Sequence, residues 1–265
     1  MRFTVSFNEH SEAIMWRALG QTYCDAWQFT KALPMLLLLL FVLEGAQHVV
    51  EWITGFYADA EMMKEASAHP LRLTLGVVKT VVGLLLGYWV IRYLMSNGSL
   101  RYTTASDPTA LRRYIISMIG YLLISAGVLL FVAIAGSRFS TPVPVLVLIA
   151  FLGALIRTLL SFWMVGSAIA DPAATFGSSI RKTWGSVLWG ITLTIIAAIP
   201  PIALHYAIGY GGLGASKPLL MTMLIVDSAV VAFLYALLAS TQAQIARHVM
   251  QRSGHTLTAS ATPSS

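Results

Sequence analysis

Six long apolar stretches constrain the fold of this chain more than any other feature. Each approaches or exceeds 18 residues, which is long enough for a helix to cross a bilayer. Of the 265 residues, 57% are hydrophobic and only 11% are charged, whereas a soluble domain averages about 25% charged residues. The sequence therefore predicts an all-α integral membrane protein with one membrane domain. The expected spans are 32–55, 71–95, 113–136, 143–169, 185–208 and 218–245.

The distribution of basic residues predicts the orientation, because loops on the cytoplasmic side carry an excess of Lys and Arg. With the N-terminus inside, eleven of the seventeen basic residues lie on the cytoplasmic side and four lie outside, with Lys79 and Arg157 inside spans. This asymmetry favours an N-in, C-in topology. It also explains the net charge of +6 without any nucleic-acid partner.

Three parts follow one another along the chain. Residues 1–31 are amphipathic and are expected to lie in the cytoplasmic interface. Residues 32–250 hold the six spans, and the Ser- and Thr-rich residues 251–265 are expected to be a disordered cytoplasmic tail. Asp-Pro pairs at 107–108 and 171–172 are typical helix starts before later spans. We therefore expect three helical hairpins, each introduced by a cytoplasmic interfacial segment, and a short helix in the outer loop 56–70.

Four charged residues lie deep inside these spans: Glu44, Lys79, Arg157 and Asp227. At about 1.5 Å per residue, they lie at similar depths in a hydrocarbon core about 30 Å thick. Each costs roughly 2.5–3.5 kcal/mol at mid-membrane, so we expect them to face inward and pair as Glu44–Lys79 and Asp227–Arg157. Two interpretations remain open: the charges set helix register, or they line a functional pathway.

The first span also places an acid–imidazole–acid stripe on one helix face, formed by Glu44, His48 and Glu51. His48 and Glu51 lie nearer the outer boundary, where we expect an outer vestibule shared with His69 and His205. These side chains are candidate ligands for zinc or iron, and His48 is also a candidate ligand for haem or a pigment. The alternative is hydrogen-bonded packing, and no motif selects a cofactor. The single cysteine excludes a multi-cysteine metal site.

Two pairs of basic residues on the cytoplasmic side are candidate binding sites for anionic lipid headgroups. The alternative is that they only set the topology. The pairs are Arg112 with Arg113, and Arg181 with Lys182.

Two short segments carry a resemblance to a known group. One is Ala26-Trp27-Gln28-Phe29-Thr30-Lys31 followed by Leu33-Pro34, and the other is Ser179-Ile180-Arg181-Lys182-Thr183-Trp184 leading into a span that ends Ile199-Pro200-Pro201. The chain resembles the bacterial six-helix membrane domains related to the membrane portion of glycerophosphodiester phosphodiesterases, and similar uncharacterised inner-membrane proteins. The resemblance implies a six-helix fold and an accessory role. It implies no phosphodiesterase activity, because the sequence holds no catalytic domain, and the acid–imidazole–acid stripe falls outside the pattern.

Three functions fit these observations. The first is an accessory or assembly subunit of a bacterial inner membrane that packs with lipids, other membrane proteins or copies of itself. The second is a small-solute or ion-coupled transporter that uses the four intramembrane charges as a relay. The third is a metal- or haem-binding membrane protein. A catalytic motif is not recognisable, so an enzyme is the less favoured class.

Overall fold

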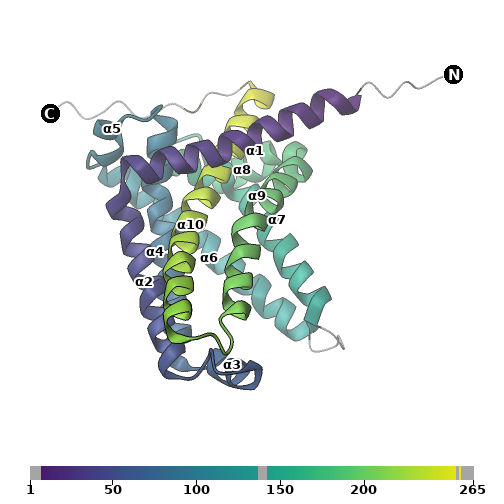
Figure 1. The fold of residues 1–265 in the computed structure, drawn as a ribbon. Helices are drawn as coiled ribbons and strands as arrows, with labels where there is room; N and C mark the ends of the chain where they lie inside the picture. Colours follow the sequence, from purple (N-terminus) through teal and green to yellow (C-terminus); the bar gives the residue numbers. More distant parts are fainter. Residues whose placement is uncertain (1–6, 137–141, 255–256, 258–265) are drawn as a thin grey trace.

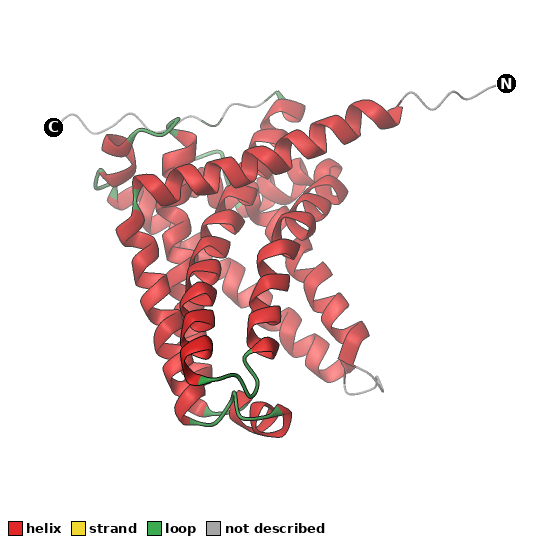
Figure 2. Ribbon diagram, viewed as in Figure 1, coloured by secondary structure: helices red, strands yellow, loops and turns green. Residues whose placement is uncertain are grey.

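The structure is a computed structural model that describes residues 7–136, 142–254 and 257. Within these residues the chain forms helices joined by short loops, without strands (Figure 2). In chain order the helices are α1 (Phe7–Ala32), α2 (Pro34–Ile53), α3 (Ala60–Ser67), α4 (Pro70–Met95), α5 (Leu100–Thr104), α6 (Pro108–Gly136), α7 (Pro142–Ala168), α8 (Phe176–Thr183), the 3₁₀ turn η1 (Trp184–Ser186), α9 (Val187–Gly211) and α10 (Lys217–Ser253).

Six helical segments of the described chain are long and apolar enough to cross a membrane, which confirms the multi-pass class. They are α2, α4, α6, α7, the run from α8 through α9, and α10. Each lies close to its expected span, and the short outer helix expected in 56–70 is α3. Helix α10 continues to Ser253, so the first residues of the expected tail are helical, while 255–256 and 258–265 lie outside the described residues.

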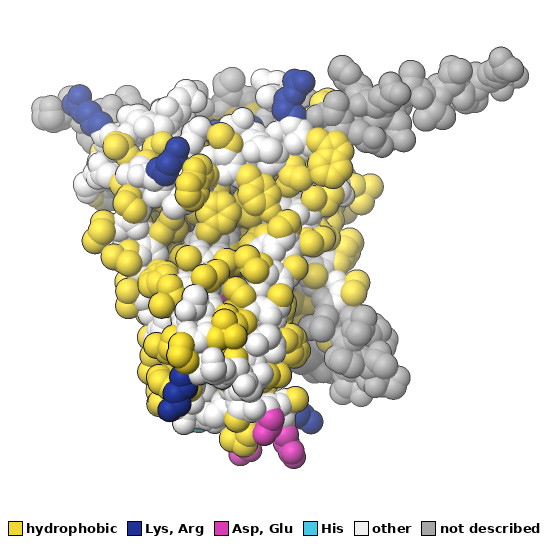
Figure 3. Space-filling view, viewed as in Figure 1, with side chains coloured by type: hydrophobic (Ala, Val, Ile, Leu, Met, Phe, Trp, Pro, Cys, Tyr) yellow, Lys and Arg dark blue, Asp and Glu magenta, His cyan; other side chains and the backbone are white. Residues whose placement is uncertain are grey.

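The distribution of side chains on the surface of the molecule agrees with a membrane-spanning protein. Figure 3 shows apolar side chains covering the middle of the visible face, with basic side chains at both ends and acidic side chains gathered at the α3 end. Large exposed apolar residues on α6, such as Leu123 and Leu130, make sense only against lipid or another membrane protein.

Helix α1 lies across one end of the bundle and packs against α10 and α9 (Figure 1). Pro34 separates it from α2, since proline disfavours helical geometry at the preceding residue, and Leu33 has φ −136°. Asp25 is buried and accepts hydrogen bonds from Gln244 Nε2 at 3.0 Å and Arg247 Nη1 at 2.8 Å. These contacts tie α1 to the end of α10.

A second link from α1 reaches α9, where the Tyr23 hydroxyl donates to the Ala197 carbonyl at 2.8 Å. Burial raises the pKa of Tyr23 above its usual value of 10, so the hydroxyl keeps its proton as a donor. Helix α1 is therefore part of the folded core at this end rather than a detached segment.

Small residues allow close helix contacts in the bundle. Helix α2 packs between α4 and α10, and α10 also packs on α9. A Cβ at Gly83 of α4 would lie 2.2 Å from the Tyr235 ring of α10, and one at Gly190 of α9 would lie 2.4 Å from Thr158 of α7. These approaches bring α4 against α10 and α9 against α7.

Candidate functional site

The acid–imidazole–acid stripe of α2 points into the bundle. Glu44 is 0% exposed, His48 5% and Glu51 2%. Because charged groups are costly in an apolar interior, each needs a partner from another helix. The partners come from α4, α9, α10 and the loop after α2.

Glu44 pairs with Lys79 of α4, through Oε2 and the Nζ ammonium. This is the pairing expected from their common depth. The second carboxylate oxygen, Oε1, is buried without a hydrogen-bond partner among the described residues.

Asp227 of α10 has two imidazole neighbours rather than an arginine. Its Oδ1 lies 2.8 Å from His205 Nδ1, and its Oδ2 lies 3.0 Å from His48 Nε2. The expected pairing with Arg157 is wrong. Arg157 of α7 instead lies over the ring of Tyr121 on α6 and approaches its hydroxyl at 3.4 Å. Depth was predictable from residue counting, but the direction in which each helix faces was not.

Glu51 is the most heavily hydrogen-bonded of these carboxylates. Its Oε2 accepts from the Tyr57 hydroxyl at 2.6 Å and lies 2.8 Å from His48 Nδ1. Its Oε1 accepts from Arg72 Nε at 2.7 Å and Gln47 Nε2 at 3.0 Å. Sequence reasoning missed Tyr57 and Arg72 as site residues, since Tyr57 lies in the loop after α2 and Arg72 lies in the first turn of α4, at the outer edge of a span. The only signal was that a buried carboxylate near a span end requires donors from an adjacent loop.

The expected outer vestibule corresponds in part to a cavity at this end of the bundle. The cavity has a volume of about 190 Å³, and its polar wall includes His48, Glu51, Arg72, His205 and Asp227. Helices α2, α3, α9 and α10, the loop before α3 and the first turn of α4 form its sides. His69 does not line this cavity; it is exposed and precedes the first residue of α4.

Two atoms at the centre of the cluster lack hydrogen bonds. Glu44 Oε1 and His48 Nε2 are buried, lie 3.7 Å apart, and have no hydrogen-bond partner among the described residues. The approach of His48 Nε2 to Asp227 Oδ2 is close but lacks the orientation of a hydrogen bond. Ligand atoms of Glu44, His205 and Asp227 also lie within 4.8 Å of one another. Two carboxylates and the His205 imidazole therefore lie close together, and His48 Nε2 approaches both carboxylates, at 3.7 Å from Glu44 Oε1 and 3.0 Å from Asp227 Oδ2.

The basic residues proposed for lipid headgroups lie at the end of the bundle that α1 crosses. Arg112 and Arg113 line a cavity of about 320 Å³ at the start of α6, and Arg113 donates to the Ala170 carbonyl at 2.8 Å. Lys182 lies over the Phe162 ring at 4.6 Å, and Arg181 is exposed. Arg113 and Lys182 thus have partners within the chain, while Arg112 and Arg181 are exposed.

Comparisons of this chain with known protein families, with curated proteins and with solved structures find no match. The function is therefore argued from the site itself.

Proposed function

We propose that this multi-pass membrane protein binds a divalent first-row transition-metal ion between α2, α9 and α10. The ligands are Glu44 Oε1, His48 Nε2, His205 and Asp227. The observation that carries the proposal is the pair of buried atoms without hydrogen bonds, Glu44 Oε1 and His48 Nε2, facing an imidazole and a carboxylate from other helices. A buried acceptor left without a partner is costly, and a cation satisfies both atoms at once.

The charge balance of the cluster supports a cation. Three carboxylates, those of Glu44, Glu51 and Asp227, lie among two permanent cations, Lys79 and Arg72. When both imidazoles are neutral, the cluster has a net charge of −1, which favours a cation over an anion. A divalent ion would bring the net charge to +1 and would use the lone pair of His48 Nε2.

The surroundings of His48 have the arrangement that metal sites use to orient an imidazole. Its Nδ1 lies 2.8 Å from Glu51 Oε2, and Tyr57 and Arg72 hold that carboxylate in turn. A carboxylate on one ring nitrogen fixes the tautomer and leaves the other nitrogen for the metal. Imidazole and carboxylate ligands together suit Zn²⁺, Mn²⁺ or Fe²⁺.

Metal content and metal titration test the proposal. Purified protein, loaded with Zn²⁺ or Mn²⁺ and desalted, is expected to retain about one ion per chain by elemental analysis. Titration calorimetry is expected to show that Asp227→Asn and His48→Gln lose this binding. Glu51→Gln is expected to weaken it about 10–100-fold, since it acts through His48.

His69→Gln is the matched control, because His69 is an exposed histidine near the same end of the bundle. It is expected to bind the ion like the wild-type protein. Equal affinity in wild type and in His48→Gln would overturn the proposal, as would a wild-type protein that retains no ion; the charge deficit would then be met by a proton on an imidazole.

The transporter interpretation receives less support from the geometry. On the side of Glu44 toward α1, the core between α2, α4 and α10 is filled by buried apolar side chains such as Leu40, Leu86 and Leu237. An ion at Glu44 has no polar route through these residues in this conformation. We therefore propose metal binding without assigning transport.

The finer expectations from the sequence remain proposals. These are the N-in, C-in topology, the three hairpins, a bacterial inner membrane, the resemblance to the phosphodiesterase-related membrane domains, and an accessory role with lipids or other membrane proteins. The packing of α2 on α4, α6 on α7 and α9 on α10 supports the hairpins. Purification in mild detergent tests the accessory role: a stoichiometric partner supports it, and a clean monomer argues against it.

A further inference from the structure

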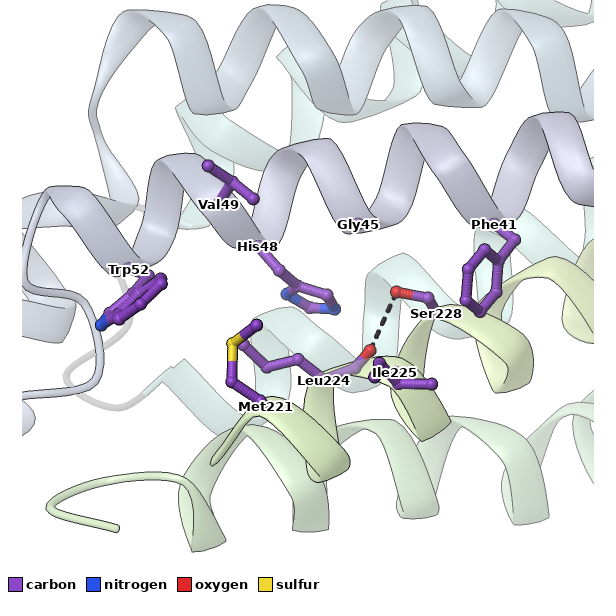
Figure 4. Close-up of a pocket in the computed structure, with 9 residues that line it drawn as sticks. All are labelled: Phe41, Gly45, His48, Val49, Trp52, Met221, Leu224, Ile225 and Ser228. Carbon is purple, nitrogen blue, oxygen red and sulfur yellow. Dashed lines mark hydrogen bonds between the residues drawn. The ribbon is translucent and has the colours of Figure 1, made fainter. Parts of the chain in front are cut away.

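His48 borders two cavities of opposite character. One is the polar cavity described above, and the other is an apolar cleft between α2 and α10 (Figure 4). In the close-up, the imidazole projects from α2 toward α10 and faces Leu224 and Met221. Phe41 and Ile225 flank the cleft further along the same helices. Ser228 adds little polarity there, because its hydroxyl donates to the Leu224 carbonyl at 2.9 Å.

The apolar cleft continues toward α1. A larger cavity of about 640 Å³ shares Phe41 and Ile225 with it, and is lined further by Trp27 of α1, Pro201 of α9 and Phe233 of α10. The two cavities thus form one apolar groove along α10. We refer to the surface from Met221 to Phe233 of α10, with the facing part of α2, as the α2–α10 groove.

The groove is somewhat longer than half the thickness of a membrane's hydrocarbon core. Met221 and Phe233 are twelve residues apart, which is about 18 Å along a helix. Half of a hydrocarbon core is about 15 Å thick. Both walls belong to candidate spans, and α1 lies where the groove ends. The groove therefore lies at the depth of lipid chains.

We propose that the α2–α10 groove holds the hydrocarbon chain of a single-chain amphiphile whose polar group lies at His48. The proposal rests on the proposed function for the polar end alone, where the metal ion held by His48 Nε2 and Glu44 Oε1 would receive the head. It names the ligand class: a membrane-soluble molecule with a carboxylate-like, metal-coordinating head and one apolar chain. Such a ligand reaches the site sideways from the bilayer.

A hydrocarbon chain fits this groove better than a helix of another protein. A helix with its side chains is about 10–12 Å across, whereas the part of the groove beside His48 has a volume of only about 140 Å³. The absence of a side chain at Gly45 opens the wall there, since a Cβ would meet only Ser228 Oγ at 3.9 Å. A chain alone would leave the buried His48 Nε2 and Glu44 Oε1 without hydrogen bonds, which is why the ligand needs a polar head.

Photo-cross-linking tests the proposal directly. The probe is a palmitate analogue with a diazirine in mid-chain, added to the full-length protein in phosphatidylcholine nanodiscs with and without Zn²⁺. Peptide mass spectrometry is expected to place the label on groove residues such as Phe41, Ile225 and Ala229. Excess palmitate is expected to reduce this label at least fivefold, because the site is saturable.

Two substitutions block the groove from opposite walls. Gly45→Leu extends a side chain beside His48, with Gly45→Ala as its control. Ala229→Trp fills the groove from an exposed position and removes no packing, with Val77→Trp on the exposed face of α4 as its control. Both blocking variants are expected to lose the competed label, and both controls to retain it. Ala229→Trp keeps the test decisive if Gly45→Leu fails to fold.

The outcomes separate this inference from metal binding. Competed label in the groove together with bound Zn²⁺ supports both, and competed label without Zn²⁺ binding supports the chain site alone. Label spread evenly over exposed apolar faces, or unaffected by palmitate, overturns the inference even where Zn²⁺ binds. A dimer that Ala229→Trp disrupts would also overturn it, because a second copy would then cover the groove.

Discussion

The carboxylate of Glu44 has two different neighbours at its two oxygens. Oε2 meets the Lys79 ammonium, while Oε1 faces His48 Nε2 without a hydrogen bond. The same residue therefore belongs to a structural ion pair and to the proposed metal site. The two roles can be separated, because the ion pair governs stability and the metal site governs binding.

Glu44→Leu is expected to destabilise the protein by about 3–5 kcal/mol, because it leaves the Lys79 charge unpaired in an apolar interior. Glu44→Leu combined with Lys79→Leu is expected to recover most of this loss, since no charge remains to be desolvated. The measurement is unfolding of the detergent-solubilised protein by SDS titration, followed by circular dichroism.

Glu61→Leu is the control for that comparison, because Glu61 is exposed on α3 and its loss is expected to change stability by less than about 0.5 kcal/mol. A double variant as unstable as Glu44→Leu would show that the two side chains do not depend on each other.

How far the site was predictable can be judged residue by residue. Glu44 and Lys79 were predictable as partners, since opposite charges at one depth have few alternatives in a membrane. The pairing of Asp227 was not, because two bases at similar depth were candidates and the rotation of each helix decides between them. The roles of Tyr57 and Arg72 could not be predicted for another reason. Both residues donate to Glu51 only because the loop after α2 and the start of α4 fold back over it.

At the scale of helices, hydrogen bonds from α1 to α9 and α10 attach α1 to the end of the bundle. Asp25 is the centre of them, with donors from Gln244 and Arg247 of α10. Because these two partners are more than two hundred residues away in sequence, the amphipathic pattern of α1 predicted a surface helix but not its attachment.

Asp25→Leu is expected to loosen α1 at a cost of about 2 kcal/mol, since it removes hydrogen bonds to a charged group and leaves Arg247, among the described residues, with the Leu94 carbonyl as its hydrogen-bond acceptor. Hydrogen–deuterium exchange is expected to rise over residues 14–32 and to stay unchanged in α4. Gln28→Leu, an exposed position on α1, serves as control. Unchanged exchange in α1 of the Asp25 variant would argue against this anchor.

The contact between α4 and α10 depends on the lack of a side chain at one position. Gly83→Ala would place Cβ 2.2 Å from the Tyr235 ring, so the ring or the helix must move, and we expect a loss of about 1–3 kcal/mol. Gly76→Ala on the same helix meets only Gln47 Oε1 at 3.7 Å and is expected to be nearly neutral. SDS unfolding compares the two, and equal stabilities would contradict the close packing.

At the scale of the whole molecule, the two ends of the bundle differ in charge. The end crossed by α1 carries most of the basic side chains, and the end with α3 carries Asp59, Glu61 and Glu65 (Figures 1 and 3). This asymmetry is the physical basis for placing the α1 end in the cytoplasm. This orientation predicts that the polar cavity opens toward the outside.

Cysteine labelling in intact cells tests this orientation, in a background that carries Cys24→Ser. Glu61→Cys on α3 is expected to react with a membrane-impermeant maleimide in intact cells. Thr104→Cys on α5 is expected to react only after the cells are permeabilised; both positions are exposed. The reverse pattern would show that the protein is oriented with its polar cavity toward the cytoplasm.

The membrane class, the number of spans and the inward placement of charged residues follow from local composition, because a bilayer penalises each exposed charge and polar backbone group wherever it occurs. The choice of partners depends on something else. Helix rotation and close contacts at residues such as Gly83 and Gly190 decide which faces meet, and both are properties of the packed bundle. Only the tertiary structure therefore places Asp227 beside two histidines instead of Arg157, and gives His48 both a polar cavity and an apolar groove.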